Sequence, residues 1–311
     1  MNAAVLRWAS AVVVVGAALA GCGSAGRAHT TAPASATSVT SAPAAKPPSP
    51  ERHRLRRPRR SHRPRARAST PLPVSASVVS HGPRTGKEVA LTFDADMTRG
   101  MLLRLRAGRV RGWYDARIVR LLRATGTPAT VFLTGLWTQT YPDVVRSLAA
   151  DPLFELENHS IDHDGFERPC YGLPTVPAPG RKREEIVGAA RTIAGVTGRQ
   201  PRFFRYPGGC HTPADDRLVA SLGETPVLWD VVSGDPFQPD PKPIVRAVLG
   251  GVRPGSIVVM HIVGAPNTPA TYDALRTIIP ALKARGYRFV TLIQLLAAPA
   301  SGAGAPTTGT D

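Results

Sequence analysis

Apolar positions follow two different periods from residue 82 onward. Short apolar runs indicate strands, and stretches whose apolar residues recur every three or four positions indicate helices. In 115–124, the apolar residues between Ile118 and Leu122 are spaced for one helical face, and Gly126 marks its end. The predicted strands cover 89–93, 129–133, 154–157, 202–205, 226–232, 256–261 and 288–292. The predicted helices cover 115–124, 143–150, 183–196, 214–222, 244–249 and 272–284.

This alternation of strands and helices favours a parallel sheet covered by helices. No glycine-rich dinucleotide loop follows the first strand, which argues against a nucleotide-binding fold. The polar motifs fall at the carboxyl ends of predicted strands or directly after them, where α/β barrels place their catalytic groups. The sequence therefore predicts a distorted (β/α) barrel of about seven parallel strands over 81–297, followed by a flexible tail over 298–311.

The first 22 residues have the anatomy of an export signal. One cation, Arg7, precedes a largely apolar run too short to span a bilayer, and small residues follow. The segment ends in Leu19-Ala20-Gly21-Cys22, which resembles the bacterial lipobox. We expect Cys22 to carry lipid and to anchor the protein on the outer side of the cell membrane. The alternative is an ordinary secretory signal with an incidental cysteine.

Residues 23–80 have the composition of a disordered tether. They are dominated by small residues, proline and arginine, and nine arginines lie within 52–67. The tether carries 11 basic residues and one acid, so +10 of the formal net charge of +17 belongs to it. Anionic lipid or wall polymers are the expected partners, although a merely extended spacer fits equally well. An exported chain meets these surfaces first, which disfavours nucleic acid as a partner.

Three residues form a candidate metal site. His159 and His163 are four positions apart, which would place both imidazoles on one side of a single helical turn. Asp94 and Asp96 follow an apolar strand, and a carboxylate with two imidazoles is a common ligand set for a hydrolytic metal. Such ligands suit Zn2+, and also Co2+ or Ni2+. Asp96 could instead cap a helix or form a turn.

A hydrolytic site also needs a base and an acid. The aspartate that is not bound to metal offers the base, and His261, at the end of a very apolar strand, offers the acid. Arg205, in the segment Arg205-Tyr206-Pro207-Gly208-Gly209, can orient a carboxylate. The two glycines of this segment allow the backbone to approach a substrate closely. His261 could instead be a core histidine, and the segment from Arg205 to Gly209 could be a simple turn.

Two cysteines remain if Cys22 is lipidated. Cys170 and Cys210 each lie just after one of these motifs. Outside the cytoplasm they could form a disulfide that ties two loops of the site together. Two unpaired thiols are the alternative.

Together the motifs resemble the polysaccharide deacetylases of carbohydrate esterase family four, over residues 86–296. The order of the segments carries the resemblance: Leu91 to Asp96, His159 to His163, Arg205 to Gly209, and Val258 to His261. The resemblance implies a distorted barrel and a zinc-like metal that removes acetyl groups from N-acetylated sugars.

The resemblance also implies a role for each matching residue. These are Asp94 as base, His159 and His163 as metal ligands, Arg205 holding the base, the Gly208 N–H as oxyanion donor, His261 as acid, and Val259 and Met260 lining the acetyl pocket.

This chain departs from the family pattern at three places. The usual adjacent Asp-Asp pair is here Asp94-Ala95-Asp96, so we expect Asp96 to be the ligand, with Asp94 or water as the alternative. The fourth motif has lost an acid and an aromatic residue, which leaves either Asp235 or Asp230 to tune His261. An insertion between Asp96 and 115 is also expected to reshape the sugar groove.

The sequence therefore predicts a membrane-tethered, metal-dependent deacetylase of the cell wall, acting on peptidoglycan or chitin-like N-acetylglucosamine. The first alternative is an esterase that removes O-acetyl groups from a polysaccharide. The second is a non-catalytic wall-binding lipoprotein, for which the altered motifs are the best support.

Overall fold

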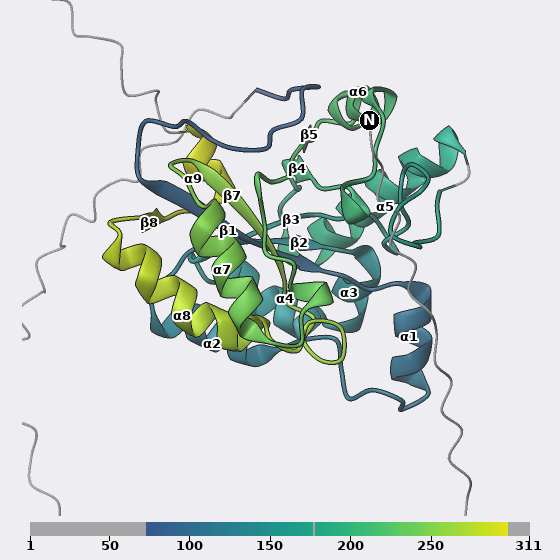
Figure 1. Ribbon diagram of the computed structural model, residues 1–311. Helices are drawn as coiled ribbons and strands as arrows, with labels where there is room; N and C mark the ends of the chain where they lie inside the picture. The colour runs from purple at the N-terminus through teal and green to yellow at the C-terminus, as the bar shows by residue number, and fades with distance from the viewer. Residues whose placement is uncertain (1–72, 177, 298–311) are drawn as a thin grey trace, which may run out of the picture. The chain divides into compact units, whose positions relative to one another are not determined.

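The structure, a computed structural model, describes residues 73–176 and 178–297 (Figure 1). Its sheet has the strand order β5-β4-β3-β2-β1-β7-β6, and β8 pairs with the start of β1. The strands are β1 (Glu88–Ala95), β2 (Ala129–Leu133), β3 (Phe154–Asn158), β4 (Phe203–Phe204), β5 (Thr225–Pro226), β6 (Val231–Val232), β7 (Ser256–His261) and β8 (Arg288–Phe289). Every pairing between these strands is parallel.

The sheet curls into an incomplete barrel. The strands at the two ends of the order, β5 and β6, do not pair with each other within the described residues. The predicted distorted barrel of about seven parallel strands is therefore confirmed.

Helices cover the outer side of the sheet, and α7 and α8 pack side by side there (Figure 1). The α-helices are α1 (Arg99–Arg106), α2 (Ala116–Ala124), α3 (Gly135–Thr140), α4 (Pro142–Ala149), α5 (Pro179–Thr197), α6 (Pro213–Ser221), α7 (Pro241–Gly251), α8 (Thr271–Ala284) and α9 (Leu292–Ala297). Two short 3-10 turns are η1 (Pro207–Gly209) and η2 (Asp235–Phe237). Local chemistry fixes several helix ends. The Asp115 side chain caps α2, for example, by accepting a hydrogen bond from the Arg117 N–H.

The two faces of the sheet bury different groups, because side chains alternate along a strand. On β1, Leu91 and Phe93 belong to the large outer core between sheet and helices. Ala90 belongs to a smaller inner core with Phe132 and Ile257. The inner face is therefore the one that leads toward the polar residues at the strand ends.

Strand register gathers the carboxyl ends at one edge. Asp94 lies opposite His261 on β7 and opposite Phe132 on β2. On the other side of β2, β3 ends at Asn158, which pairs with Phe204 of β4. His159 and Arg205 follow these two strands directly, so four motifs far apart in sequence meet at one edge of the sheet.

Several predicted elements need correction. The predicted strand 226–232 is two strands on opposite ends of the sheet order, separated by a bend at Asp230. The predicted strand 288–292 stops at Phe289, and α9 begins at Leu292. The helices α1, α3 and α9 were not predicted, because each is short and two of them carry few apolar residues at helical spacing.

The folded part also begins before residue 81. Within the predicted tether, the Val79 N–H donates to the Pro226 carbonyl oxygen at 2.9 Å, and the Ser75 N–H donates to the Thr225 hydroxyl at 3.1 Å. Val79 also packs against the inner core, which explains why this short apolar segment joins the domain.

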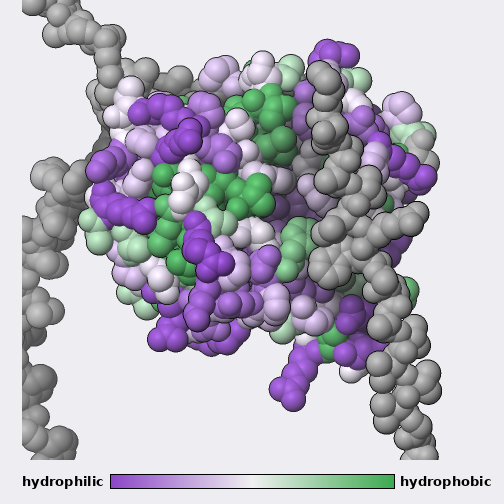
Figure 2. Space-filling view, viewed as in Figure 1, coloured by the Kyte–Doolittle hydropathy of each residue, from purple (hydrophilic) through white to green (hydrophobic). Residues whose placement is uncertain are grey.

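The predictions for the signal segment, for Cys22, for the arginine-rich part of the tether and for the tail 298–311 lie outside the described residues. Among the helices in the described ranges, none combines the length and the apolar character needed to cross a bilayer. On the face drawn in Figure 2, apolar residues (green) interrupt a mostly hydrophilic (purple) surface.

Candidate active site

The first motif places two carboxylates on the same side of the sheet. Alternation along β1 sends Ala95 into the outer core, whereas Asp94 and Asp96, on either side of it, point the other way, toward the histidines. Asp94 is buried, and Asp96 lies just past the end of the strand with a largely buried side chain. Because Ala95 separates them, the carboxylates of Asp94 and Asp96 both lie on the side of the sheet that faces the histidines.

Asp94 is held by a buried guanidinium. Arg205 Nη1 donates to Asp94 Oδ1 at 2.7 Å and to the Thr92 hydroxyl at 2.8 Å, and Nη2 donates to the Leu228 carbonyl oxygen. The guanidinium carbon also lies 3.9 Å from the ring centroid of Phe132. Burial lowers the pKa of Arg205 from its ordinary value, and the charge of Asp94 opposes that shift. These contacts fix Asp94 Oδ1 and leave Oδ2 on the side of His159.

Asp96, rather than Asp94, forms the tighter cluster with the two histidines. Asp96 Oδ1 lies 3.4 Å from His159 Nε2 and 3.3 Å from His163 Nε2, whereas Asp94 Oδ2 lies 3.7 Å from His159 Nε2. Ligands placed about 2.0–2.1 Å from a tetrahedral cation lie about 3.3–3.4 Å from one another. The distances around Asp96 fit that arrangement.

Buried atoms without hydrogen-bond partners also fit a metal. Asp96 Oδ1 and His159 Nε2 are both buried without such a partner. His159 Nδ1 lies 2.8 Å from the Arg205 carbonyl oxygen. A carbonyl can only accept, so the proton is on Nδ1 and the Nε2 lone pair faces the cluster. The donor set of Asp96, His159 and His163 is therefore suited to a divalent cation.

The second motif is a loop and not the helical turn that its spacing predicted. Ser160 and His163 both have a φ of +67°, which an α-helix does not allow. Hydrogen bonds hold this loop: the Ser160 N–H donates to Asn158 Oδ1, and the Ile161 N–H donates to Glu185 Oε2. The two imidazoles meet at a centroid distance of 5.0 Å through this loop geometry.

His261 belongs to the same site, and its imidazole is paired with the carboxylate of Asp235. Its Nδ1 lies 2.8 Å from Asp235 Oδ1, and its backbone N–H donates to Asp235 Oδ2 at 2.9 Å. Asp235 is fully buried and also accepts from the Ser233 and Thr271 hydroxyls. Burial acts to lower the pKa of His261, but the charges of Asp235 and Asp96 outweigh it and raise that pKa to about 10.

The structure pairs His261 with Asp235 and not with Asp230. Asp230 instead accepts from Arg84 and from the Ile257 N–H, away from the histidine. The pKa of Asp96 lies well below its ordinary value, because the positive charges of His163 and His261 outweigh the effect of burial. The site therefore combines the negative carboxylates of Asp96 and Asp235 with the imidazoles of His163 and His261, which can carry protons.

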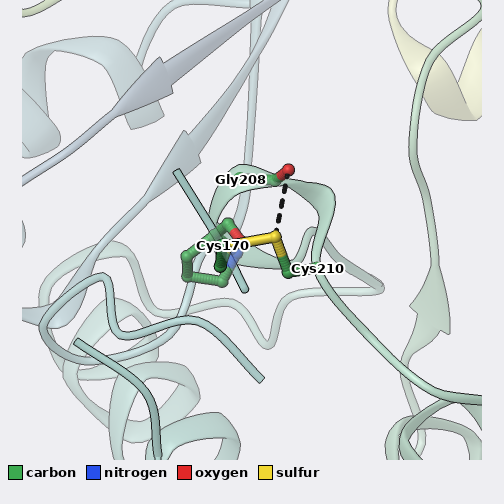
Figure 3. The surroundings of a disulfide bond; sticks show 4 residues. Cys170, Gly208 and Cys210 are labelled. Carbon is green, nitrogen blue, oxygen red and sulfur yellow. Dashed lines mark hydrogen bonds between the residues drawn. A yellow bond between two sulfur atoms is a disulfide. The ribbon is translucent and has the colours of Figure 1, made fainter. Parts of the chain in front are cut away.

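The third motif is a tight turn supported by a disulfide. Gly208 and Gly209 have φ values of +62° and +72°, and a Cβ on Gly208 would lie 2.8 Å from Cys170 Sγ. Cys170 and Cys210 are joined by a disulfide, and Cys210 Sγ lies 3.7 Å from the Gly208 carbonyl oxygen (Figure 3). Of the two alternatives, the structure contains the bridge.

One predicted pocket residue lies elsewhere. Val259 and His261 share the inner face of β7, but Met260 between them points into the outer core. Alternation along the strand therefore places Val259 at the site and excludes Met260 from it.

Sequence reasoning missed several residues that position the site. Asn158 Nδ2 donates to Glu224 Oε1 at 2.9 Å, and Thr92 accepts from Arg205. Glu185, on α5, supports the histidine loop from a distant part of the chain. Asn158 could have been identified from its position directly before His159. Nothing in the sequence points to Glu185 or Glu224.

The insertion after Asp96 forms α1. Its first residue, Arg99, donates from Nε to Asp162 Oδ2 at 2.6 Å and so joins the insertion to the histidine loop. The insertion thus borders the site.

A curled parallel sheet thus carries a carboxylate–histidine cluster at its carboxyl edge, and this donor set suits a hydrolytic metal. Residues 81–227 match the polysaccharide deacetylase family. A chitooligosaccharide deacetylase of Bradyrhizobium sp. (strain ANU 289) is 30% identical over 189 residues, which cover 57% of this chain and 82% of that protein. The chain belongs to the polysaccharide deacetylase family, and the protein is a hydrolase of this family.

Other relatives have similar names. A peptidoglycan-N-acetylglucosamine deacetylase of Bacillus cereus is 28% identical over 218 residues, covering 69% of this chain and 90% of that protein. Among solved structures, a peptidoglycan N-acetylglucosamine deacetylase has a TM-score of 0.60 at 25% identity, covering 70% of this chain and 92% of that one.

Two further structures bear on the alternatives. A family 4 acetyl xylan esterase from Clostridium thermocellum, in complex with a cobalt ion, has a TM-score of 0.53 at 29% identity, covering 67% of this chain and 89% of that one. A family pseudoenzyme from Bacillus anthracis, at 24% identity and a TM-score of 0.58, covers 71% of this chain and 69% of that one and shares the fold.

Proposed function

We propose that the protein removes N-acetyl groups from amino-sugar polymers of the cell wall, either peptidoglycan or a chitin-like N-acetylglucosamine chain. One observation carries the proposal. The cluster Asp96–His159–His163 can hold a cation without Asp94, and Arg205 orients Asp94 separately beside it. A ligand set and a free base are the two parts that hydrolysis requires.

The chemistry divides among the residues of the chain. When bound by the cluster, a divalent cation supplies Lewis acidity that polarises the acetyl carbonyl and acidifies water. Asp94 Oδ2 accepts a proton from the attacking water, since Oδ1 is occupied by Arg205. His261 donates from Nε2 to the departing amine nitrogen, because its Nδ1 is engaged by Asp235. Val259 contacts the acetyl methyl, and the Gly208 N–H donates to the developing oxyanion.

The metal is proposed to be Zn2+. Two imidazoles and one carboxylate also accept Co2+ or Ni2+. Elemental analysis of the purified protein distinguishes these ions.

The proposal extends to the location of the enzyme. Cys22 is proposed to carry lipid that anchors the chain outside the cell membrane, and the arginine-rich tether is proposed to contact anionic lipid or wall polymers. Replacing Cys22 by Ser should release the protein from the membrane fraction. Retention of the variant in that fraction would overturn the anchor.

Mass spectrometry of acetate release tests the activity. The wild-type protein should release acetate from an N-acetylglucosamine oligomer and from purified peptidoglycan, whereas His159→Ala and Asp94→Asn should not. Equal release by all three proteins would refute the proposal.

Ester hydrolysis is the second candidate, supported by the similarity to an acetyl xylan esterase. A comparison of acetylated xylan with the N-acetylglucosamine oligomer separates the two activities. A wall-binding role without catalysis predicts no bound metal and no acetate release from either polymer.

A further inference from the structure

Three exposed apolar side chains lie in segments that border the site. Within the described residues, the large apolar side chains exposed to solvent include Tyr171 (76%), Phe237 (68%) and Val232 (58%). Tyr171 follows the disulfide cysteine Cys170, and Val232 and Phe237 stand on either side of the segment that carries Asp235. Single exposed apolar residues need no explanation, but a group of them at a site does.

Two of these side chains touch each other. The rings of Tyr171 and Phe237 have centroids 6.3 Å apart and are inclined by 38°. The contact does not bury them, since each keeps more than half of its surface in water. A pair that served only to stabilise the fold would be expected inside the core, because burial is what makes aromatic contacts stabilising.

Tyr171 is held in an unfavourable backbone conformation. Its φ is +47°, in the left-handed region that residues other than glycine rarely occupy. The preceding residue is fixed by the bond between Cys170 and Cys210. Conformations of this kind are retained where the surroundings enforce them, and they concentrate at functional positions.

The pair spans the rim between two groups of the site. A Cβ built on Gly208 would lie 3.2 Å from Tyr171 Cδ2, so this ring lies beside the turn proposed to hold the oxyanion. Phe237 ends the turn that begins with Asp235, the partner of His261. The two rings therefore extend from the oxyanion side of the site to its acid side.

We propose that Tyr171 and Phe237 form an aromatic platform for a neighbouring sugar ring of the substrate, next to the ring whose acetyl group is removed. One face of a pyranose presents axial C–H groups and packs against aromatic rings, while its hydroxyls stay in water. The proposal rests on the proposed function. Because the platform contacts a second ring, it selects polymers over single sugars.

Kinetics on substrates of different length test the platform. For Tyr171→Ala and Phe237→Ala, kcat/KM for an N-acetylglucosamine pentamer should fall about tenfold relative to kcat/KM for 4-nitrophenyl acetate. The loss should appear in KM of the pentamer. Tyr171→Phe should restore most of it, because the ring remains. Val74→Ala, which truncates an exposed apolar side chain in the segment before β1, is the matched control and should change neither value.

A parallel loss on both substrates, or no loss on the pentamer, would overturn the platform. Calorimetric titration of the pentamer into Asp94→Asn, with and without Tyr171→Ala, measures binding without turnover. About tenfold weaker binding in the double variant supports the platform even if the wild-type protein releases no acetate, which would refute only the proposed function. Equal binding by both proteins overturns the platform.

Discussion

Arg205 and Asp94 form a fully buried ion pair, with Nη1 and Oδ1 2.7 Å apart, at the centre of the site. The arginine follows β4 and the aspartate is the penultimate residue of β1, so two separate strands must be in place before the pair can form. The pair therefore links the stability of the sheet to the orientation of the proposed base.

Replacing Arg205 by Ala should leave the buried Asp94 without its counter-charge. Loss of one partner of a buried pair costs about 3–5 kcal/mol in the free energy of unfolding. Activity should fall at least about 100-fold, because the carboxylate loses its fixed orientation. Denaturant unfolding and acetate release measure the two effects. Arg120→Ala, at an exposed position on α2, is the control, and an equally small effect of both variants would contradict the expected role of the pair.

Metal content should separate the two aspartates. Asp96→Ala should purify with much less bound metal, because it removes the carboxylate of the cluster. Asp94→Asn should keep its metal and lose about 100-fold or more of its activity. Elemental analysis of both proteins gives the answer, with Asp143→Asn on the surface of α4 as a control. Metal loss in Asp94→Asn together with retention in Asp96→Ala would reverse the assignment.

Stability should fall as pH rises from about 5 to about 8. Burial raises the pKa of Glu224 from 4.5 to about 8, although the hydrogen bond from Asn158 opposes the shift. The folded state therefore binds a proton that the unfolded state releases in this pH window, and the folded state is favoured at its lower end. Each unit of pKa difference corresponds to about 1.4 kcal/mol.

Glu224→Gln should flatten this pH dependence. The amide can still accept from Asn158 but does not titrate. Some slope should remain, because burial also raises the pKa of Glu185, to about 7. Denaturant unfolding at pH 5 and pH 8 measures the slope, with the exposed Glu184→Gln as control. An unchanged slope in Glu224→Gln would show that this carboxyl is not the origin.

The disulfide should stabilise both the domain and the turn at Gly208. Its cysteines are 40 residues apart, and closing a loop of that length stabilises a fold by about 2–4 kcal/mol. The double variant Cys170→Ser/Cys210→Ser should unfold at lower temperature and release acetate more slowly, because Gly208 and Tyr171 lose their support. Thermal unfolding with and without reductant is the measurement. Unchanged stability after complete reduction of the wild-type protein would argue against this role.

The alternation of strands and helices was predictable from the sequence. The bounds of β2 and β7 match their predicted ranges, because each is a mostly apolar run that follows a turn containing glycine. The break between β5 and β6 was not predictable. Residues 226–232 are mostly apolar, and only the positions of β4 and β7 decide that the two halves join different neighbours.

The site could be predicted as a set of residue types but not as a geometry. Motif order identified Asp94, His159, Arg205 and His261, and these residues meet at one edge of the sheet. The support for the histidine loop comes from Glu185, on a helix that no local pattern connects to it. Contacts across such distances arise from tertiary packing, which a single sequence does not encode locally.

Ala95 shows how a motif can be altered without being lost. Along a strand, side chains separated by an even number of positions point to the same side. Two acids that are two positions apart therefore share a side. Here the interval is even, and both carboxylates arrive on the side of the histidines. A search for neighbouring acids would score this first motif as broken, whereas the carboxylates of Asp94, within β1, and of Asp96, just past its end, still lie beside the same histidine.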